Sequence, residues 1–190
     1  MAAGDEQAFV QLYRKHQRSI YRFALLMSGS ANIAEEVTQE VFLTLIREPG
    51  RYDPARGPVL AFLYGVARNH VLHSLKKEKN YVPLSAELTE RNAFGESVAP
   101  EDPFGDYTRN EMIQLVRRAV LTLPPRYREV VVLCDFQEVS CAEAALVLDC
   151  AVGTVNSRLH RGHTLLLKKL RAAAKLDPTS TPAQGMRCFA

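Results

Sequence analysis

The sequence lacks paired cysteines and long apolar runs, and each absence excludes a class of protein. The four cysteines (Cys134, Cys141, Cys150 and Cys188) form no C-x-x-C pair, so their spacing does not fit a structural zinc site, and we expect reduced thiols and no bound metal. No apolar run approaches the ~20 residues that a helix needs to span a bilayer, and the N-terminus has no signal-peptide core. We therefore expect a cytoplasmic protein with no membrane insertion.

Strand signals are also scarce. No stretch alternates polar and apolar residues for long enough to predict a sheet, and the run at 130–132 sits in a helical frame. Apolar residues instead recur at three- and four-residue steps over 5–28, over 59–79 and through the C-terminal third. A further helix is expected to start at Asn32, with Glu35 completing a capping box. The predicted fold class is all-α.

Proline and acidic residues divide the chain into two helical parts. We predict a first domain at 5–79, a flexible acidic linker at 80–106, a second domain at 107–174 and a disordered tail at 175–190. The linker interpretation depends on its loss of periodicity and on its prolines.

Charge is distributed unevenly although the net charge is only +3. Residues 51–80 and 150–175 each carry six Lys or Arg, whereas 81–112 carry seven Asp or Glu. Basic segments on folded helices indicate a polyanionic partner. Charge alone leaves the alternative of solvated helix faces equally open.

The most informative stretch lies near the C-terminus. Ser140 and Glu143 form a capping-box pattern that predicts a helix start. Asp149 then suits the left-handed position of a tight turn, and a further helix should begin near Ala151 with Val152, Val155 and Leu159 pointing inward. Helix, tight turn, helix is the geometry that enters the major groove of DNA. An outward stripe of short polar and arginine side chains could read bases there: Thr154, Asn156, Ser157, Arg158 and Arg161.

These patterns alone leave an ordinary helical hairpin open, and they also leave a stand-alone regulator that binds duplex DNA as a dimer. An enzyme would need a catalytic cluster. Acidic residues around Glu36 and histidine pairs such as His70 and His73 could be imagined as ligands, but no nucleophile or supporting pattern accompanies them. We therefore expect no catalytic residues and no cofactor.

Four segments together resemble one family, the bacterial extracytoplasmic-function (ECF) sigma factors. Residues 152–161 (VGTVNSRLHR) are similar to the family's recognition helix, and residues 123–130 (LPPRYREV) resemble the start of the preceding helix. Residues 34–43 (AEEVTQEVFL) resemble its polymerase-binding helix, and residues 62–69 (FLYGVARN) the segment that reads the −10 promoter element. The four motifs stand in the expected order and span nearly all of 8–172.

The resemblance implies a non-catalytic specificity subunit of RNA polymerase. The first domain would bind the clamp of the largest polymerase subunit and melt the −10 element; the second would contact the flap of the second-largest subunit and hold the −35 element as duplex. The polymerase-binding face would be Glu36, Gln39, Glu40, Leu43 and Arg47. The −10 contacts would be Arg51, Arg56, Phe62, Tyr64, Arg68, Asn69, His73, Lys76 and Lys77. The −35 contacts would be Thr154, Asn156, Ser157, Arg158, Arg161 and Lys168.

The resemblance also implies regulation by a separate anti-sigma protein, and two further expectations accompany it. The loop at 51–57 is a candidate pocket for a flipped base, and the acidic linker could mimic RNA charge in the polymerase channel. The chain departs from the family pattern at several positions, among them His73, Asn156 and Gly162. Glycine inside the recognition helix is expected to loosen it by roughly 1 kcal/mol.

Overall fold

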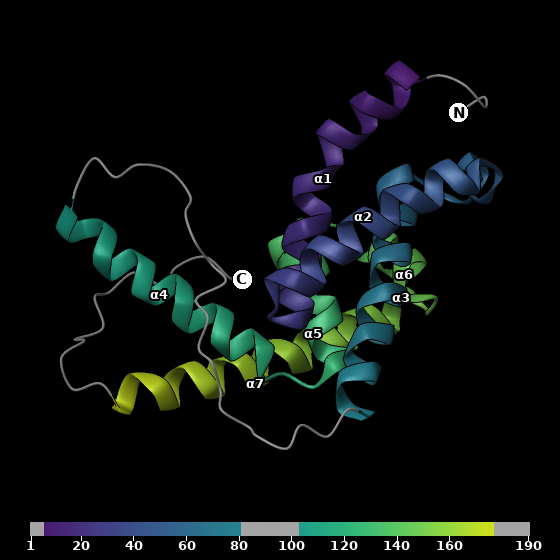
Figure 1. Cartoon of the computed structure of the whole chain (residues 1–190). Helices are drawn as coiled ribbons and strands as arrows, with labels where there is room; N and C mark the ends of the chain where they lie inside the picture. The colour runs from purple at the N-terminus through teal and green to yellow at the C-terminus, as the bar shows by residue number, and fades with distance from the viewer. Residues whose placement is uncertain (1–5, 81–102, 177–190) are drawn as a thin grey trace.

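Every regular element in the described part of the chain is helical (Figure 1). The computed structural model describes residues 6–80 and 103–176. The predicted all-α class is therefore confirmed for these two ranges. Residues 81–102, most of the expected linker, and 177–190, most of the expected tail, lie outside the described residues. None of the helices in 6–80 and 103–176 combines the length and apolarity that crossing a membrane would require.

The N-terminal unit consists of three long helices joined by short connections. Two single-turn 3₁₀ helices, Pro49–Arg51 and Pro54–Arg56, lie between the second and third helices, where Pro and Gly prevent a longer helix. The long helices are α1 (Glu6–Ser28), α2 (Ala31–Arg47) and α3 (Val59–Asn80).

The turn between α1 and α2 differs from the expected one by two residues. Gly29 adopts φ +76°, a left-handed conformation, and its N–H donates to the carbonyl of Leu25 at 2.8 Å. Ser30 then caps α2, because its hydroxyl accepts from the Ile33 N–H. The predicted start at Asn32 is therefore wrong. Ser30 precedes it with the extended backbone that an N-cap needs.

The apolar stripes of these helices meet in one core. The largest fully buried side chains of this core come from all three helices. They include an aromatic pair, Phe23 and Tyr64, whose ring centroids are 5.3 Å apart. Burial of such side chains provides most of the driving force for this unit. The other large members are Ile20, Met27, Val37, Val41, Leu63 and Val71.

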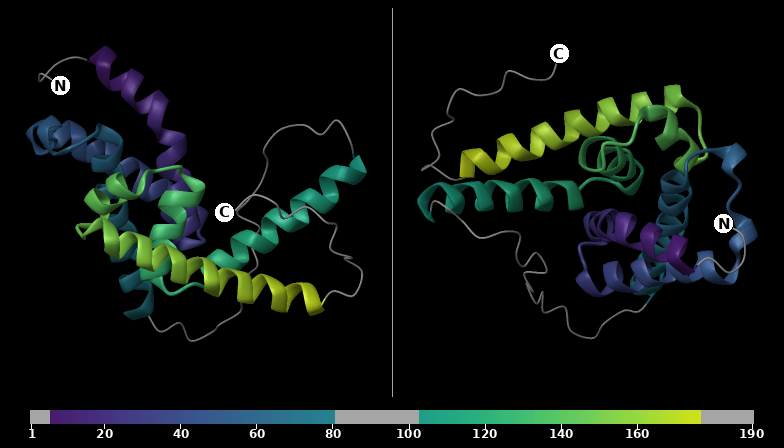
Figure 2. Two further views of the ribbon diagram at one scale, coloured as in Figure 1. Left: turned by 180° about the vertical axis from the view of Figure 1, so that it is seen from behind. Right: turned by 90° about the horizontal axis from the view of Figure 1, so that it is seen from above.

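The C-terminal unit has four α-helices and one π-turn. The long helices α4 and α7 lie side by side in Figures 1 and 2, and the shorter elements fill one end of the pair. The unit starts four residues before the predicted 107, because Pro103 opens a helix. Its elements are α4 (Pro103–Leu121), α5 (Pro125–Val131), η3 (Val132–Phe136), α6 (Cys141–Leu148) and α7 (Val152–Leu176).

The two units pack against each other instead of standing apart. Core residues of α1, α2 and α3 form one continuous apolar cluster with those of α4, α5, η3 and α6. Helix α3 lies against α6, and the C-terminal end of α1 meets α4, α5 and η3 (Figure 2). At the join, Leu121 of α4 packs so closely on Gly29 that a Cβ there would lie 3.1 Å from its Cδ1. Sequence reasoning predicted two domains but not this contact between them.

Candidate nucleic-acid and polymerase interfaces

The helix-turn-helix has the local structure that its sequence predicts. Ser140 and Glu143 form a complete capping box, in which the Ser140 hydroxyl accepts from the Glu143 N–H at 3.2 Å and the Glu143 carboxylate accepts from the Ser140 N–H at 3.1 Å. Asp149 takes the left-handed conformation at φ 49°, and the carbonyl of Ala151 starts α7. The capping box and the turn are therefore confirmed.

The first turn of α7 is more open than expected. Val155 is fully buried and Leu159 is partly buried, as predicted, but Val152 is 42% exposed. The expectation that Val152 points inward is wrong for this arrangement, because it faces a cleft between α7 and the N-terminal unit.

Most of the expected −35 residues lie on the surface of α7. Asn156, Ser157, Arg161 and Lys168 are exposed, and Thr154 and Arg158 are partly exposed. The Ser157 hydroxyl donates to the Thr154 carbonyl at 3.0 Å within the helix. A face with short polar side chains beside arginines matches the donor and acceptor pattern of base edges in a major groove.

Arg161 is held by a residue that sequence reasoning did not assign to the site. The Arg161 guanidinium donates to the Tyr127 hydroxyl, an interaction that lowers the pKa of Tyr127. The guanidinium carbon of Arg126 lies 4.7 Å from the centroid of the same ring. Tyr127 of α5 therefore positions Arg161 on the recognition helix.

The loop at 51–57 forms one wall of a cleft between the two units. Tyr52 donates its hydroxyl to the Gly57 carbonyl at 3.2 Å, and Asp53 accepts from the Ala55 N–H at 2.9 Å, so the loop is held by its own side chains. The Tyr52 and Phe62 rings lie 5.6 Å apart. These contacts give the loop a defined shape beside α3.

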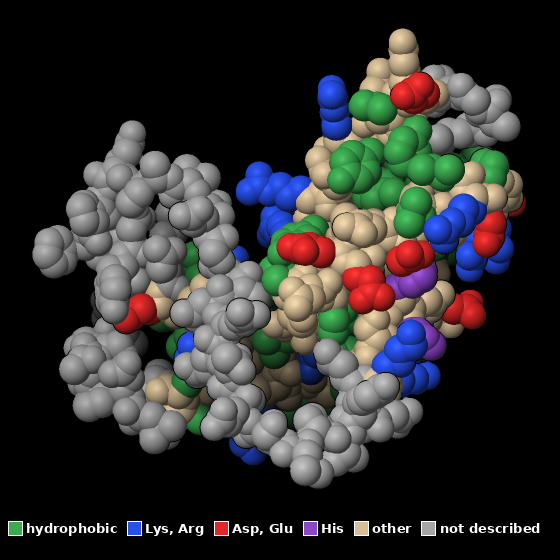
Figure 3. All heavy atoms as spheres, in the orientation of Figure 1, with side chains coloured by type: hydrophobic (Ala, Val, Ile, Leu, Met, Phe, Trp, Pro, Cys, Tyr) green, Lys and Arg blue, Asp and Glu red, His purple; other side chains and the backbone are tan. Residues whose placement is uncertain are grey.

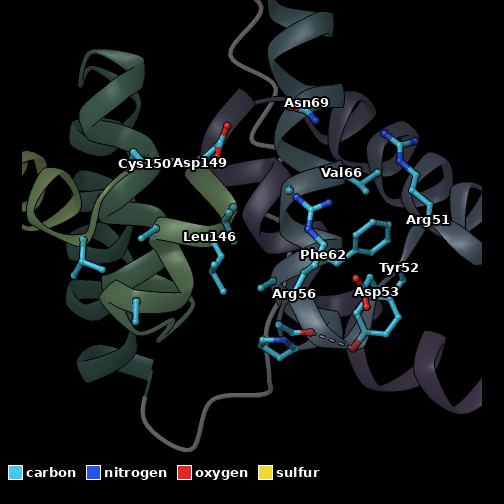
Figure 4. Close-up of a pocket in the computed structure, with 18 of the residues that line it drawn as sticks. Arg51, Tyr52, Asp53, Arg56, Phe62, Val66, Asn69, Leu146, Asp149 and Cys150 are labelled. Carbon is cyan, nitrogen blue, oxygen red and sulfur yellow. Dashed lines mark hydrogen bonds between the residues drawn. The ribbon is translucent and has the colours of Figure 1, made fainter.

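The cleft itself has a volume of about 680 Å³ and opens between the two units (Figure 4). Arg51, Arg56, Phe62 and Asn69 contribute to the wall from the N-terminal unit, and Leu146 faces them from α6. Four expected −10 residues therefore meet at one place. The far wall belongs to the helix-turn-helix, and no local sequence pattern predicts this neighbour.

The remaining basic residues follow α3 away from this cleft. His73, Lys76 and Lys77 are exposed at one- and three-residue steps. In Figure 3 basic and histidine side chains gather over this part of the molecule, next to acidic side chains over α2. Such a basic stripe suits a phosphate backbone.

Two expected −10 residues are engaged by the C-terminal unit in this arrangement. Tyr64 is 1% exposed and donates its hydroxyl at 3.2 Å to Gln137, the residue that follows η3, and burial raises the pKa of Tyr64 to about 12. Arg68 forms an ion pair at 3.2 Å with Glu129 of α5, whose side chain is only 5% exposed. A −10 contact by the Tyr64 ring would need an open face of that ring, which this arrangement does not present.

The expected polymerase-binding face forms a continuous surface on α2. Glu36, Gln39 and Arg47 are exposed, and Glu40 and Leu43 are partly exposed. Arg47 and Glu40 form a solvent-exposed ion pair at 3.7 Å. An acidic surface with a small apolar contact suits a basic helical partner.

Comparison with known proteins decides the family. Residues 12–81 match Sigma-70 region 2, and residues 113–166 match Sigma-70 region 4. The ECF RNA polymerase sigma factor SigW of Bacillus subtilis is 30% identical over 175 residues, covering 88% of this chain and 91% of SigW. SigM of Mycobacterium tuberculosis, also an ECF sigma factor, is 34% identical over 174 residues, covering 88% of this chain and 80% of SigM.

The chain belongs to the ECF RNA polymerase sigma factors.

Solved structures share the fold of this sigma factor. RpoE of Bartonella quintana, solved with the anti-sigma factor NepR, superposes with a TM-score of 0.65 at 23% identity, covering 87% of this chain and 98% of that one. CnrH, solved with the cytosolic domain of CnrY, gives 0.64 at 23% identity, covering 93% of each chain. Family membership decides against the stand-alone regulator and the enzyme, because a sigma factor is a non-catalytic specificity subunit of RNA polymerase.

Gly162 has a role in the sigma factor that its sequence did not predict. A Cβ at this position would lie 2.7 Å from Cγ2 of Val131 and 3.5 Å from the Tyr127 carbonyl oxygen. Glycine therefore lets the recognition helix approach α5 closely, and this close packing sets the helix on the body of the unit. One residue along, His163 and Asp135 are 2.7 Å apart and connect α7 to η3.

Proposed function

We propose that this sigma factor reads its promoter with two surfaces, one in each unit. The face of α7 that carries Asn156, Ser157, Arg158 and Arg161 would enter the major groove of the −35 element. The loop at 51–57 and the exposed side of α3 would hold the −10 element. The observation that carries the −35 assignment is the complete helix-turn-helix, in which the capped α6 and the left-handed Asp149 present the start of α7.

Core polymerase would dock on the α2 face. Support comes from the exposed acidic side chains Glu36 and Glu40 beside the partly exposed Leu43, and from the family match over the same helix. The N-terminal unit would bind the clamp and the C-terminal unit the flap of core polymerase. We place the protein in the cytoplasm, where core polymerase acts.

An anti-sigma protein would control access to these surfaces. RpoE of Bartonella quintana, which has the same fold, was solved with the anti-sigma factor NepR. The docking positions above are surfaces that such a protein could cover. The acidic segment at 81–102, for which an RNA-mimicking role is expected, lies outside the described residues.

The −35 assignment can be tested with holoenzyme assembled from core polymerase and the sigma factor. We expect Arg158→Ala or Arg161→Ala to weaken −35 recognition by ~1–3 kcal/mol where the arginine makes a bidentate contact to a base. The control is Arg118→Ala, which removes an exposed arginine of α4 outside the proposed site. The measurement is promoter binding against a set of single-base −35 substitutions. Unchanged discrimination in both α7 variants would refute the assignment.

A further inference from the structure

Two arginines from different helices meet at one tyrosine beside the recognition helix. Tyr127 of α5 is 8% exposed, and its hydroxyl accepts from the guanidinium of Arg161 on α7. The guanidinium of Arg126 lies 4.7 Å from the centroid of the same ring and also interacts with the hydroxyl. Both arginines are exposed, whereas the ring that they share is buried. The two positive charges are therefore held close together on a fixed support.

The close approach of α7 to α5 makes this pair possible. Gly162 follows Arg161, and a Cβ there would lie 2.7 Å from Cγ2 of Val131 and 3.7 Å from Cβ of Tyr127. Because glycine has no side chain, the recognition helix comes near enough for Arg161 to reach the Tyr127 hydroxyl. No local sequence pattern places Arg126 beside α7, so the sequence did not indicate Arg126 as a −35 contact.

The arginine pair has no acidic partner in the described part of the chain. The salt bridges within residues 6–80 and 103–176 involve neither Arg126 nor Arg161. The Tyr127 hydroxyl is an uncharged acceptor, so it orients the guanidinium groups without neutralising them. Two like charges held this close repel each other, and a bound anion removes that cost. The arrangement therefore favours an anion that accepts hydrogen bonds from both arginines.

The position of Arg161 along α7 points to the DNA backbone instead of a base edge. Base edges are contacted mainly by the N-terminal residues of a recognition helix. Arg161 stands seven residues beyond Thr154, roughly 10 Å further along the helix axis, and its guanidinium is held by α5. A guanine edge takes one arginine through uncharged acceptors, whereas a phosphate presents charged oxygens that can accept from two.

We propose that Arg126 and Arg161, oriented by Tyr127, form a phosphate site for the backbone of the −35 duplex. The proposal rests on the proposed entry of α7 into the major groove of the −35 element. The site fixes the register and angle of α7 on the duplex, because phosphate contacts position a protein and carry no sequence information directly. Base selection is then left to residues nearer the start of α7, among them Asn156 and Arg158.

The first test uses holoenzyme assembled from core polymerase and −35 duplexes in which one phosphate at a time is replaced by an uncharged methylphosphonate. We expect one replacement to weaken wild-type binding about tenfold and to leave the Arg126→Ala, Arg161→Ala double variant unaffected, because the two arginines and that phosphate act as one unit. On unmodified duplex, the dependence of log K on log salt should become shallower by about 1 in the double variant. The control is Arg118→Ala at an exposed position of α4, which should respond to every replacement as wild type does.

The second test measures binding of the single variants to a set of single-base −35 substitutions. Arg126→Ala and Arg161→Ala should weaken binding to every sequence by a similar factor, whereas Arg158→Ala should relax discrimination at one position. Tyr127→Phe keeps the buried ring and deletes only the hydroxyl, so it should weaken binding to every sequence by a smaller factor.

Two results would overturn the phosphate site. One is that every methylphosphonate weakens the double variant as strongly as wild type, and the other is that Arg161→Ala loses discrimination at a single base pair. Failure of the −35 assignment itself looks different, because binding would then be unchanged in Arg158→Ala as well as in Arg161→Ala.

Discussion

Replacing Gly162 by alanine sets two opposing effects against each other. Alanine is favoured over glycine inside a helix by about 1 kcal/mol, so at an open position the change stabilises. Here the added Cβ would lie 2.7 Å from Cγ2 of Val131, which is fully buried and cannot move aside without disturbing the core. Overpacking of this kind costs about 1–3 kcal/mol. We therefore expect Gly162→Ala to lower the free energy of unfolding by about 1 kcal/mol net.

The assay is urea unfolding of the intact sigma factor followed by circular dichroism. Gly65→Ala in α3 is the matched control, because it is also inside a helix and its Cβ would meet nothing within 4 Å; it should stabilise by about 0.5–1 kcal/mol. The double variant, Val131→Ala with Gly162→Ala, should lose less free energy of unfolding than the sum of the two single variants, because the clashing methyl group is gone. Stabilisation by Gly162→Ala as large as that of Gly65→Ala would refute the packing argument.

Two further changes test local features of the fold. Ser140→Ala removes both the hydroxyl that caps α6 and its bond to Glu143, and should destabilise by about 1 kcal/mol in urea unfolding; an unchanged midpoint would show that the cap contributes nothing. His16 is 8% exposed, and burial together with the charge of Lys15 lowers its pKa below the ordinary value of 6.5. The unfolded chain then binds more protons, so stability should fall as the pH drops below about 6.5, by at most about 1.4 kcal/mol per pH unit. His16→Gln should flatten this part of the profile, and an identical profile in the variant would contradict the assignment.

Local signals allowed accurate predictions for the helix-turn-helix. The capping box of Ser140 with Glu143 and the left-handed turn at Asp149 depend on interactions within four residues, so the sequence is enough to find them. The predicted start of α2 at Asn32 is wrong for an equally local reason. Ser30 and Asn32 are both good capping residues, and only the position of the preceding Gly29 turn decides between them.

The features that sequence reasoning missed are contacts between distant segments. A tyrosine can stack on a base or fill a core, and the local sequence around Tyr64 does not distinguish the two. Its hydroxyl donates to Gln137, 73 residues away. The sequence around Arg128 indicates an ordinary surface cation. Its guanidinium nevertheless donates to the carbonyl of Met27, which lies 101 residues earlier. Neither local sequence pattern predicts a contact with a residue so far away along the chain. Helix propensity alone predicts that Gly162 weakens its helix, because propensity is a local property and close packing between helices is not.

The described cysteines are partly buried against the apolar cluster, which fits a packing role. Cys134 packs against the apolar cluster, and burial together with the nearby Cys141 raises the pKa of its thiol to about 12. A thiol with so high a pKa remains protonated near neutral pH, and a protonated thiol is a poor nucleophile. Among the residues that the structure describes, no group of His, Cys, Asp and Glu side chains is arranged to hold a metal ion.

The most direct test of the central claim is binding of the purified chain to core RNA polymerase, followed by run-off transcription on fragments of the source genome. We expect a stable complex and transcripts that start at specific promoters only when both components are present. Alignment of those promoters would give the −35 and −10 sequences. Failure to associate with core, together with tight and specific binding to duplex DNA by the chain alone, would contradict it.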